Sequence, residues 1–155
     1  MKAKKTIIDR RIQDFIALCR ENQVKVTPQR LAVYKEILDS TDHPDAEKLL
    51  ARLRKSFPSI SLDTVYRTLW LLNDFGLIST LGLTREKTRF EANLEFHHHF
   101  VCVECGSTSD FFSDTLNAVD LPADVEKMGE VRNTHVEVRG ICNTCLKKRK
   151  TGKKS

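Results

Sequence analysis

Four cysteines in two Cys-x-x-Cys pairs constrain this chain of 155 residues more than any other feature. Cys102 and Cys105 form the first pair, and 36 residues separate them from the second pair, Cys142 and Cys145. Four thiolates match a closed tetrahedral Zn2+ site, and the long spacing requires a folded β unit that brings the pairs together. Four unligated buried thiols and a redox-active pair are the alternatives. The pattern favours a structural zinc site.

The surroundings of these cysteines favour metal over disulfides. No apolar run approaches the roughly 18–20 residues that a membrane span needs, and no apolar segment of a signal peptide follows the first five residues. We therefore expect a soluble, cytoplasmic protein that does not associate with membranes. Thiols stay reduced in the cytosol, so paired cysteines there more often bind metal.

The charges are distributed unevenly along the chain. Residues 1–90 carry 17 Lys and Arg against 11 Asp and Glu, a net charge of +6, whereas residues 91–146 carry 3 against 10, a net charge of −7. The tail from Lys147 carries six basic residues and no acidic one. A basic front half suits a polyanion such as nucleic acid, and an acidic back half suits cations. Solvated helix faces with a flexible basic tail would give a similar distribution.

The front half has the pattern of successive helices. Apolar residues recur at helical spacing over residues 7–22, and Cys19 lies on that apolar stripe, which favours a core thiol over a ligand. Thr27 followed by Pro28 predicts the N-cap of a second helix, which extends through Leu38. A third helix is expected from about Asp45 toward Phe57.

A fourth helix and a hairpin follow. Ser61 is the expected N-cap of this helix, and Gly76 is the expected residue just beyond its end. Alternating runs at residues 77–81 and 88–92, joined by a turn at residues 82–87, predict a β-hairpin. Helices followed by a hairpin are typical of a winged helix-turn-helix, in which the last helix enters the major groove. Polar residues placed to face the DNA from this helix are Thr64, Tyr66, Arg67 and Thr68.

The composition changes near residues 92–95, where we place a domain boundary. Short β runs at 96–103 and 131–140 and a helical stretch at 114–128 predict a small second domain. The expected fold class is α+β, with a winged helix-turn-helix DNA-binding domain and a small α/β dimerisation domain that contains the four-cysteine zinc site. The expected ranges are 1–92 for the first domain, 96–150 for the second and 151–155 for a disordered basic tail.

Three consecutive histidines suggest a second metal site. Side chains alternate in an extended segment, so His97 and His99 face one side and His98 faces the other. Glu91 at the end of the hairpin and His43 between two helices could complete a site of nitrogen and oxygen ligands. Such a donor set favours Fe2+, Mn2+ or Zn2+ over Ca2+. A histidine like His43 is otherwise a surface or capping residue.

The chain resembles the ferric uptake regulator family over essentially its whole length. The motifs that carry the resemblance are TPQR (27–30), DHP (42–44), TVYRTL (64–69), LxxxGL (72–77), RFE (89–91), HHHFVCxxCG (97–106), DF (110–111) and GICxxC (140–145). The resemblance implies a dimeric winged-helix repressor that binds palindromic operator DNA when a regulatory metal is bound.

The resemblance also implies roles for individual residues. The structural zinc ligands of the family match Cys102, Cys105, Cys142 and Cys145. The regulatory ligands match His43, Glu91, His97 and His99, joined by Asp110 in the peroxide-sensing branch. Positions involved in DNA contact match Tyr66 and Arg67. Some members carry an additional metal site, for which His98, Asp110 and His135 are candidates here. Phe96 stands at one ligand position of that site, and an incomplete site would leave His98 vestigial or facing solvent.

Assignment to a branch rests on few residues. Glu91 resembles the iron-responsive branch, whereas Asp110 resembles the peroxide sensors. The zinc-responsive branch has a cysteine in the regulatory site, and Cys19 is expected in the core. We favour repression that depends on Fe2+. Peroxide sensing through iron-catalysed histidine oxidation is the alternative, followed by a zinc- or manganese-responsive regulator, and Zn2+ could occupy the regulatory site in vitro.

Two other classes of protein fit the sequence less well. A zinc hydrolase needs an open metal position and a general base, and a four-thiolate site offers neither. The sequence also contains no H-E-x-x-H helix, so we expect no enzyme activity. A zinc-ribbon interaction module without DNA binding does not explain the basic front half with Tyr66, Arg67 and the hairpin.

Overall fold

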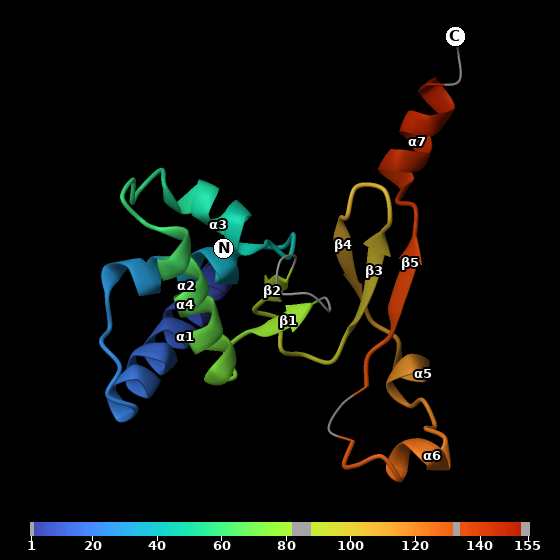
Figure 1. The fold of residues 1–155 in the computed structure, drawn as a ribbon, viewed down its shortest axis with the longest axis horizontal. Coiled ribbons are helices and arrows are strands. Elements are labelled where there is room, and N and C mark those ends of the chain that lie inside the picture. The colour runs from blue at the N-terminus through green and yellow to red at the C-terminus, as the bar shows by residue number, and fades with distance from the viewer. Residues whose placement is uncertain (1, 82–87, 132–133, 153–155) are drawn as a thin grey trace. The chain divides into compact units, whose positions relative to one another are not determined.

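The computed structural model describes residues 2–81, 88–131 and 134–152 of the chain. The chain divides into two compact units, Met1–Leu94 and Glu95–Ser155. Helices and a two-stranded sheet make up the first unit, and a three-stranded sheet with short helices makes up the second (Figure 1). The α+β class expected from the sequence is therefore confirmed.

The first unit contains four helices, and a side chain caps the start of the last three. They are α1 (Lys2–Glu21), α2 (Pro28–Asp39), α3 (Ala46–Leu53) and α4 (Leu62–Asp74). The side chains of Thr27, Asp45 and Ser61 each accept a hydrogen bond from the backbone N–H three residues further on, as predicted. Gly76 follows α4 with a φ of 66°, a conformation that glycine adopts without a Cβ clash.

Two helix boundaries differ from those expected. The first helix begins at Lys2 rather than near residue 7, and α3 ends at Leu53, before the expected end near Phe57. The apolar side chains of α3 end at the same point, since Leu49, Leu50 and Leu53 are its buried leucines. Apolar periodicity marks the part of a helix that faces the core, and α1 extends beyond that part.

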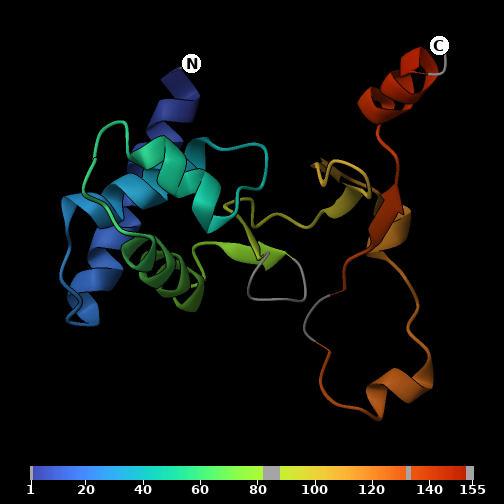
Figure 2. The same ribbon diagram turned by 45° about the horizontal axis from the view of Figure 1, so that its top comes forward.

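The core of the first unit is made by all four helices and the hairpin. In both Figure 1 and Figure 2 the four helices lie together as one bundle. The edge of the Phe15 ring packs against Tyr34, with the ring centroids 5.4 Å apart. Cys19 is fully buried in this core, as the sequence predicts, and burial raises the pKa of its thiol. The main fully buried residues are Phe15, Cys19, Tyr34, Ile37, Leu49, Val65, Leu69, Leu72 and Phe90.

The predicted hairpin strands are present. β1 (Ser79–Leu81) pairs antiparallel with β2 (Arg89–Glu91), and Ser79 lies opposite Glu91. The expected turn at residues 82–87 lies outside the described residues. The guanidinium group of Arg11 on α1 donates to Leu77 O at 2.7 Å and to Ala92 O at 2.6 Å. Arg11 therefore ties both outer ends of the hairpin to the first helix.

The second unit is built on a three-stranded sheet in the order β4-β3-β5. β3 (His98–Cys102) is the central strand, antiparallel to β4 (Thr108–Phe111) and parallel to β5 (Glu137–Gly140). β3 and β5 are shorter than the β runs expected at 96–103 and 131–140. The sequence analysis did not predict β4, whose four residues have no clear alternation of polar and apolar side chains.

Two short helices connect β4 to β5 in place of the single helical stretch expected at 114–128. α5 (Asp114–Asn117) begins at its N-cap Ser113, and α6 (Ala123–Glu126) begins after Pro122. Proline has no N–H to donate and disfavours helical conformation in the residue before it, so one helix cannot extend through this point.

The chain ends in α7 (Asn143–Gly152), which begins directly after Cys142 (Figure 1). This helix includes Thr151 and Gly152, which the sequence analysis placed in a disordered tail, and residues 153–155 lie outside the described part. No helix within the described ranges is long and apolar enough to cross a membrane.

Candidate metal sites and DNA-reading surface

The four paired cysteines lie together in the second unit. All four sulfur atoms lie within 4.8 Å of one another, with 3.9 Å between those of Cys102 and Cys145 and 3.8 Å between those of Cys105 and Cys142. Zn–S bonds of about 2.3 Å place the sulfurs of a tetrahedral site about 3.8 Å apart, whereas a disulfide needs about 2.0 Å. The spacing fits a zinc ion, and the chain carries the four-cysteine zinc site expected from the sequence.

The sheet explains how two pairs so far apart in the sequence meet. Cys102 is the last residue of β3 and lies opposite Gly140 of β5. Two residues beyond Gly140 the chain reaches Cys142, whose N–H donates to Cys102 Sγ at 3.3 Å. A Cβ on Gly140 would lie 3.0 Å from the ring of Phe100, so this position leaves little room for a side chain.

Hydrogen bonds to the sulfurs of the first cysteine pair favour the thiolate form, which is the form that binds a metal ion. Hydrogen bonds from the backbone N–H groups of Cys105 and Cys142 are the main reason that the pKa of Cys102 is lowered to about 6. The hydroxyl of Ser107, 3.2 Å from Cys105 Sγ, lowers the pKa of Cys105. Gly106 follows this pair with a φ of 68°, a left-handed conformation that glycine adopts without a Cβ clash.

Cys145 differs from the first pair in its surroundings. It is buried, and loss of solvent together with the neighbouring sulfurs raises the pKa of its thiol. A divalent ion favours the thiolate form at all four positions, so metal binding at this site releases protons.

A second set of ligand groups lies at the other end of the sheet. His97 and His99 face the same side of the chain, with ring centroids 4.6 Å apart. Asp110 of β4 lies opposite His99 of β3, and its Oδ1 is 3.6 Å from His99 Nε2 and 3.8 Å from His97 Nε2. His97 Nδ1 is 2.6 Å from the carbonyl of Glu95, which only accepts, so Nδ1 carries the proton and Nε2 offers a lone pair.

The first unit holds a smaller group of similar chemistry. Nε2 of His43 lies 2.9 Å from Oε2 of Glu91, and both side chains are buried. The hydroxyl of Ser79 donates to Oε1 of Glu91 at 2.9 Å and orients the carboxylate. His43 has a φ of 46°, which a non-glycine residue rarely adopts, and such positions are often found at functional sites. Each unit therefore carries nitrogen and oxygen donors suited to a divalent cation, and all of them except the exposed Asp110 are buried.

His98 faces the opposite side of the strand from its neighbours. It is 0% exposed, and its ring packs between Phe96 and Phe111 at centroid distances of 5.9 Å and 5.4 Å. Its Nδ1 accepts a hydrogen bond from the N–H of Val136 at 3.1 Å. The predicted alternation of faces is confirmed, but the expectation that His98 faces solvent is wrong. Phe111 of β4 and Phe96, which precedes β3, pack against this ring.

His98 and His135, the candidates for a possible additional metal site, have different ring neighbours. The ring of His135 lies beside that of His99, with a centroid distance of 6.3 Å, whereas His98 contacts phenylalanines. Within the described ranges, neither His98 nor His135 belongs to a group of three or more side chains that could hold a metal.

The exposed face of α4 holds fewer polar groups than expected. Arg67 is 78% exposed and pairs with Asp63 at 2.8 Å. Tyr66 is half-buried against the core. The hydroxyl of Thr64 lies 2.9 Å from Ser61 Oγ, at the N-terminal cap of the helix. Surface ion pairs contribute little free energy, so Arg67 can exchange Asp63 for a phosphate group.

Two other residues of α4 differ from the expectation. Thr68 was expected on the DNA-facing side, but it is 1% exposed and donates its hydroxyl hydrogen to Thr64 O at 2.8 Å. The apolar stripe around Val65, Leu69 and Leu72 is wide enough to include it. Trp70, which the sequence analysis did not single out, is 37% exposed and packs edge-on against Phe90 of β2.

Comparison with known proteins identifies the relatives of this chain. The model of the ferric uptake regulator family matches residues 21–139. The peroxide-responsive repressor PerR of Staphylococcus epidermidis is 32% identical over 145 residues, which cover 94% of this chain and 97% of that protein. The Campylobacter jejuni peroxide stress regulator is 29% identical with a TM-score of 0.64, covering 84% of this chain and 98% of the other.

A further solved structure supports the fold. The Helicobacter pylori ferric uptake regulator matches with a TM-score of 0.76 at 22% identity, covering 90% of this chain and 93% of the other. The fold of this chain is thus similar to one already seen in a solved structure.

We expect Cys102→Ser and Cys142→Ser each to lose one tightly bound zinc ion per chain and to unfold much of the second unit. Removal of one thiolate leaves an incomplete ligand set, and zinc binding of order 10 kcal/mol is part of folding at such sites. Metal content by mass spectrometry and near-ultraviolet circular dichroism measure the two effects. Cys19→Ala, in the core of the other unit, is the matched control and should keep its zinc. A full zinc ion in either of the first two variants would contradict the assignment.

Proposed function

The chain belongs to the ferric uptake regulator family of metal-dependent, DNA-binding transcriptional repressors, and we propose that it is a peroxide-sensing member. In this proposal it binds palindromic operator DNA as a homodimer while Fe2+ or Mn2+ occupies its regulatory site. Peroxide oxidises histidine ligands of the iron-loaded form, and repression ends. The observation that carries this proposal is the similarity to a peroxide-responsive repressor over nearly the full length of both chains.

The regulatory site that we propose draws ligands from both units. His43 and Glu91 come from the first unit, and the second contributes His97, His99 and Asp110. Imidazole and carboxylate ligands suit Fe2+ and Mn2+, and Zn2+ can occupy the same donors in vitro. The orientation of His97 by the Glu95 carbonyl supports this role, because a second hydrogen bond fixes the tautomer of a metal-binding histidine.

Ligands from two units give the metal control over DNA binding. An ion held by both units limits their relative orientations, and this selects the orientation that fits an operator. The two α4 helices of a dimer can then enter successive major grooves, with Arg67 on a phosphate and Tyr66 near base edges. Exposed apolar side chains of the second unit support a homodimer, among them Phe112, Val119, Val138 and Leu146.

The peroxide-sensing step requires iron next to oxidisable side chains. Bound Fe2+ would supply the electron that reduces peroxide. The imidazoles of His43 and His97 lie among the proposed ligands. Either ring could take up one oxygen atom of hydrogen peroxide in a net two-electron oxidation, with the O–O bond broken and the other oxygen leaving as water. An oxidised ring is a poorer nitrogen donor, so the donor set weakens and the regulatory ion is lost. Asp110 supports this proposal, because an aspartate at this position resembles the peroxide-sensing branch.

An iron-responsive regulator is the second candidate, and Glu91 is the residue that favours it. We expected this branch from the sequence, but the similarity to peroxide-responsive repressors favours peroxide sensing instead. The two candidates share the ligand positions and differ in their response to peroxide. A zinc- or manganese-responsive regulator would be distinguished by the metal that restores operator binding at the lowest concentration.

We expect low doses of hydrogen peroxide to add one oxygen atom to His43 or His97 in the Fe2+-loaded protein and to abolish operator binding. Protein prepared without oxygen is treated and digested, and fragment ions in mass spectrometry locate the added mass and separate His97 from His98. Operator binding is measured on the same samples by gel shift.

The Mn2+-loaded protein is the matched control, because it exposes the same residues to peroxide without iron. It should gain no oxygen at these positions and should keep its DNA binding. Iron-loaded protein that binds the operator equally well before and after peroxide, with unmodified histidines, would favour the iron-responsive candidate.

Asparagine substitutions at the three histidines separate the two faces of the strand. We expect His97→Asn and His99→Asn to abolish metal-dependent operator binding while zinc and folding are kept, because asparagine lacks the distal Nε2 nitrogen. His98→Asn is the control, since its amide oxygen can still accept the hydrogen bond from Val136 N. Gel shift with and without Mn2+ measures the effect. Equal loss of metal response in all three variants, with the zinc retained, would refute the proposed ligand set.

A further inference from the structure

A cluster of positive charge stands out in the second unit. Residues 91–146 carry 3 Lys and Arg against 10 Asp and Glu, but four consecutive cations follow at positions 147–150. All four belong to α7 and are exposed. In the described part of the chain, no carboxylate lies within ion-pair distance of Lys147, Lys148 or Lys150. Neither the zinc site nor the regulatory ligands use these side chains.

The zinc site holds α7 at its start. Cys142 immediately precedes the helix, and Cys145 is buried in its first turn. The guanidinium group of Arg149, one turn further on, pairs with Glu104, which lies between the two cysteines of the first pair. Two contacts along the helix therefore fix α7 to the cysteine cluster, and both depend on the folded zinc site.

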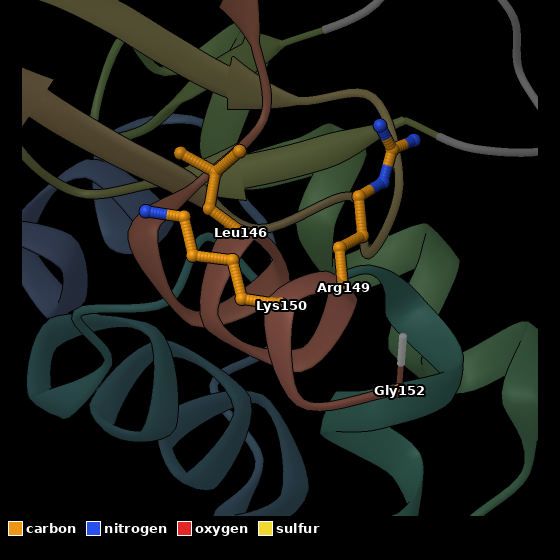
Figure 3. A pocket seen from close by; sticks show the side chains of 4 residues that line it. All are labelled: Leu146, Arg149, Lys150 and Gly152. Atoms are coloured by element: carbon orange, nitrogen blue, oxygen red, sulfur yellow. The ribbon is translucent and has the colours of Figure 1, made fainter. Parts of the chain in front are cut away.

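The side chains of α7 fit an anionic surface better than an apolar one. Figure 3 shows Arg149 and Lys150 projecting from different sides of the helix, with Leu146 beside Lys150. Leu146 is the one large apolar side chain of the helix. A helix that lies on a membrane needs a continuous apolar face, and α7 lacks one. Closely spaced lysines instead match the regular phosphates of a nucleic acid backbone.

We propose that α7 is a second DNA-binding surface, whose lysines contact backbone phosphates without reading sequence. The inference extends the DNA binding of the family to an element outside the winged-helix unit. Because the zinc site rather than the regulatory ligands holds α7, this contact is present with or without the regulatory metal. It provides non-specific affinity that keeps the metal-free protein on DNA.

The experiment compares the wild-type protein with Lys147→Gln/Lys148→Gln/Lys150→Gln on a duplex of arbitrary sequence. The zinc-loaded full chain is used after removal of the regulatory metal, and fluorescence anisotropy gives the affinity at several salt concentrations. Each phosphate contact contributes about 0.9 to the slope of log affinity against log salt, so the slope should fall by up to about 2.7 per chain. At 0.1 M salt the affinity should fall on the order of tenfold or more.

Two controls separate position from charge. The triple variant with arginine at the same positions keeps the charge and should bind like the wild type. Lys127→Gln removes one exposed cation at the residue that follows α6 in the same unit and should change the slope much less than Lys148→Gln. Zinc content, measured on every variant, verifies that the cysteine site is intact.

Three outcomes decide the proposal. Lower affinity and slope for the glutamine variant alone support it. Equal binding of the glutamine variant and the wild type at all salt concentrations overturns it. Loss of binding to phosphatidylglycerol vesicles with unchanged DNA binding also overturns it and assigns α7 to a membrane surface. Metal-dependent binding of the wild type to its operator is measured separately, so a failure of the proposed function would be seen independently.

Discussion

The parallel pairing of β3 with β5 is the contact on which the second unit depends. It joins segments almost forty residues apart and places Cys102 opposite Gly140, so that both cysteine pairs reach one point. A non-local contact of this kind has a substantial entropic cost of loop closure. Zinc binding at such sites contributes on the order of 10 kcal/mol to folding, which offsets that cost. The sheet and the zinc site therefore stabilise each other.

The same strand carries the donors of the regulatory site at its other end. β3 ends at Cys102 and begins at His98, so its residues extend from one metal site to the other. Alternation along the strand directs His97 and His99 toward Asp110, while His98 packs between phenylalanine rings. The hydrogen bond that His98 accepts from Val136 N lies on the opposite side of the strand from the ligand side chains. Three identical side chains in a row thus have two different roles, which the backbone geometry determines.

Features with a local cause were predictable from the sequence. The N-caps at Thr27, Asp45 and Ser61, the left-handed Gly106 and the four-thiolate cluster each follow from short-range chemistry. Features that depend on distant neighbours were not predictable from the residues alone. Asp110 lies beside His99 only because β4 pairs with β3, and β4 has no clear periodic pattern. Thr68 is buried on the same stripe of α4 as Val65, Leu69 and Leu72, which its polar side chain did not indicate. The branch of the family rests on single ligand positions such as Glu91 and Asp110, and full-length similarity was needed to weigh them.

The central claim is that one regulatory ion, bound by ligands from both units, is coupled to DNA binding. Such coupling is reciprocal, so it can be measured from the metal side. The most direct test is the affinity for Mn2+ of the zinc-loaded protein, determined by calorimetry with and without operator DNA. The account predicts that the operator raises the Mn2+ affinity by the same factor by which Mn2+ raises the operator affinity, roughly 5- to 150-fold. Identical Mn2+ affinities in the presence and absence of the operator would contradict it.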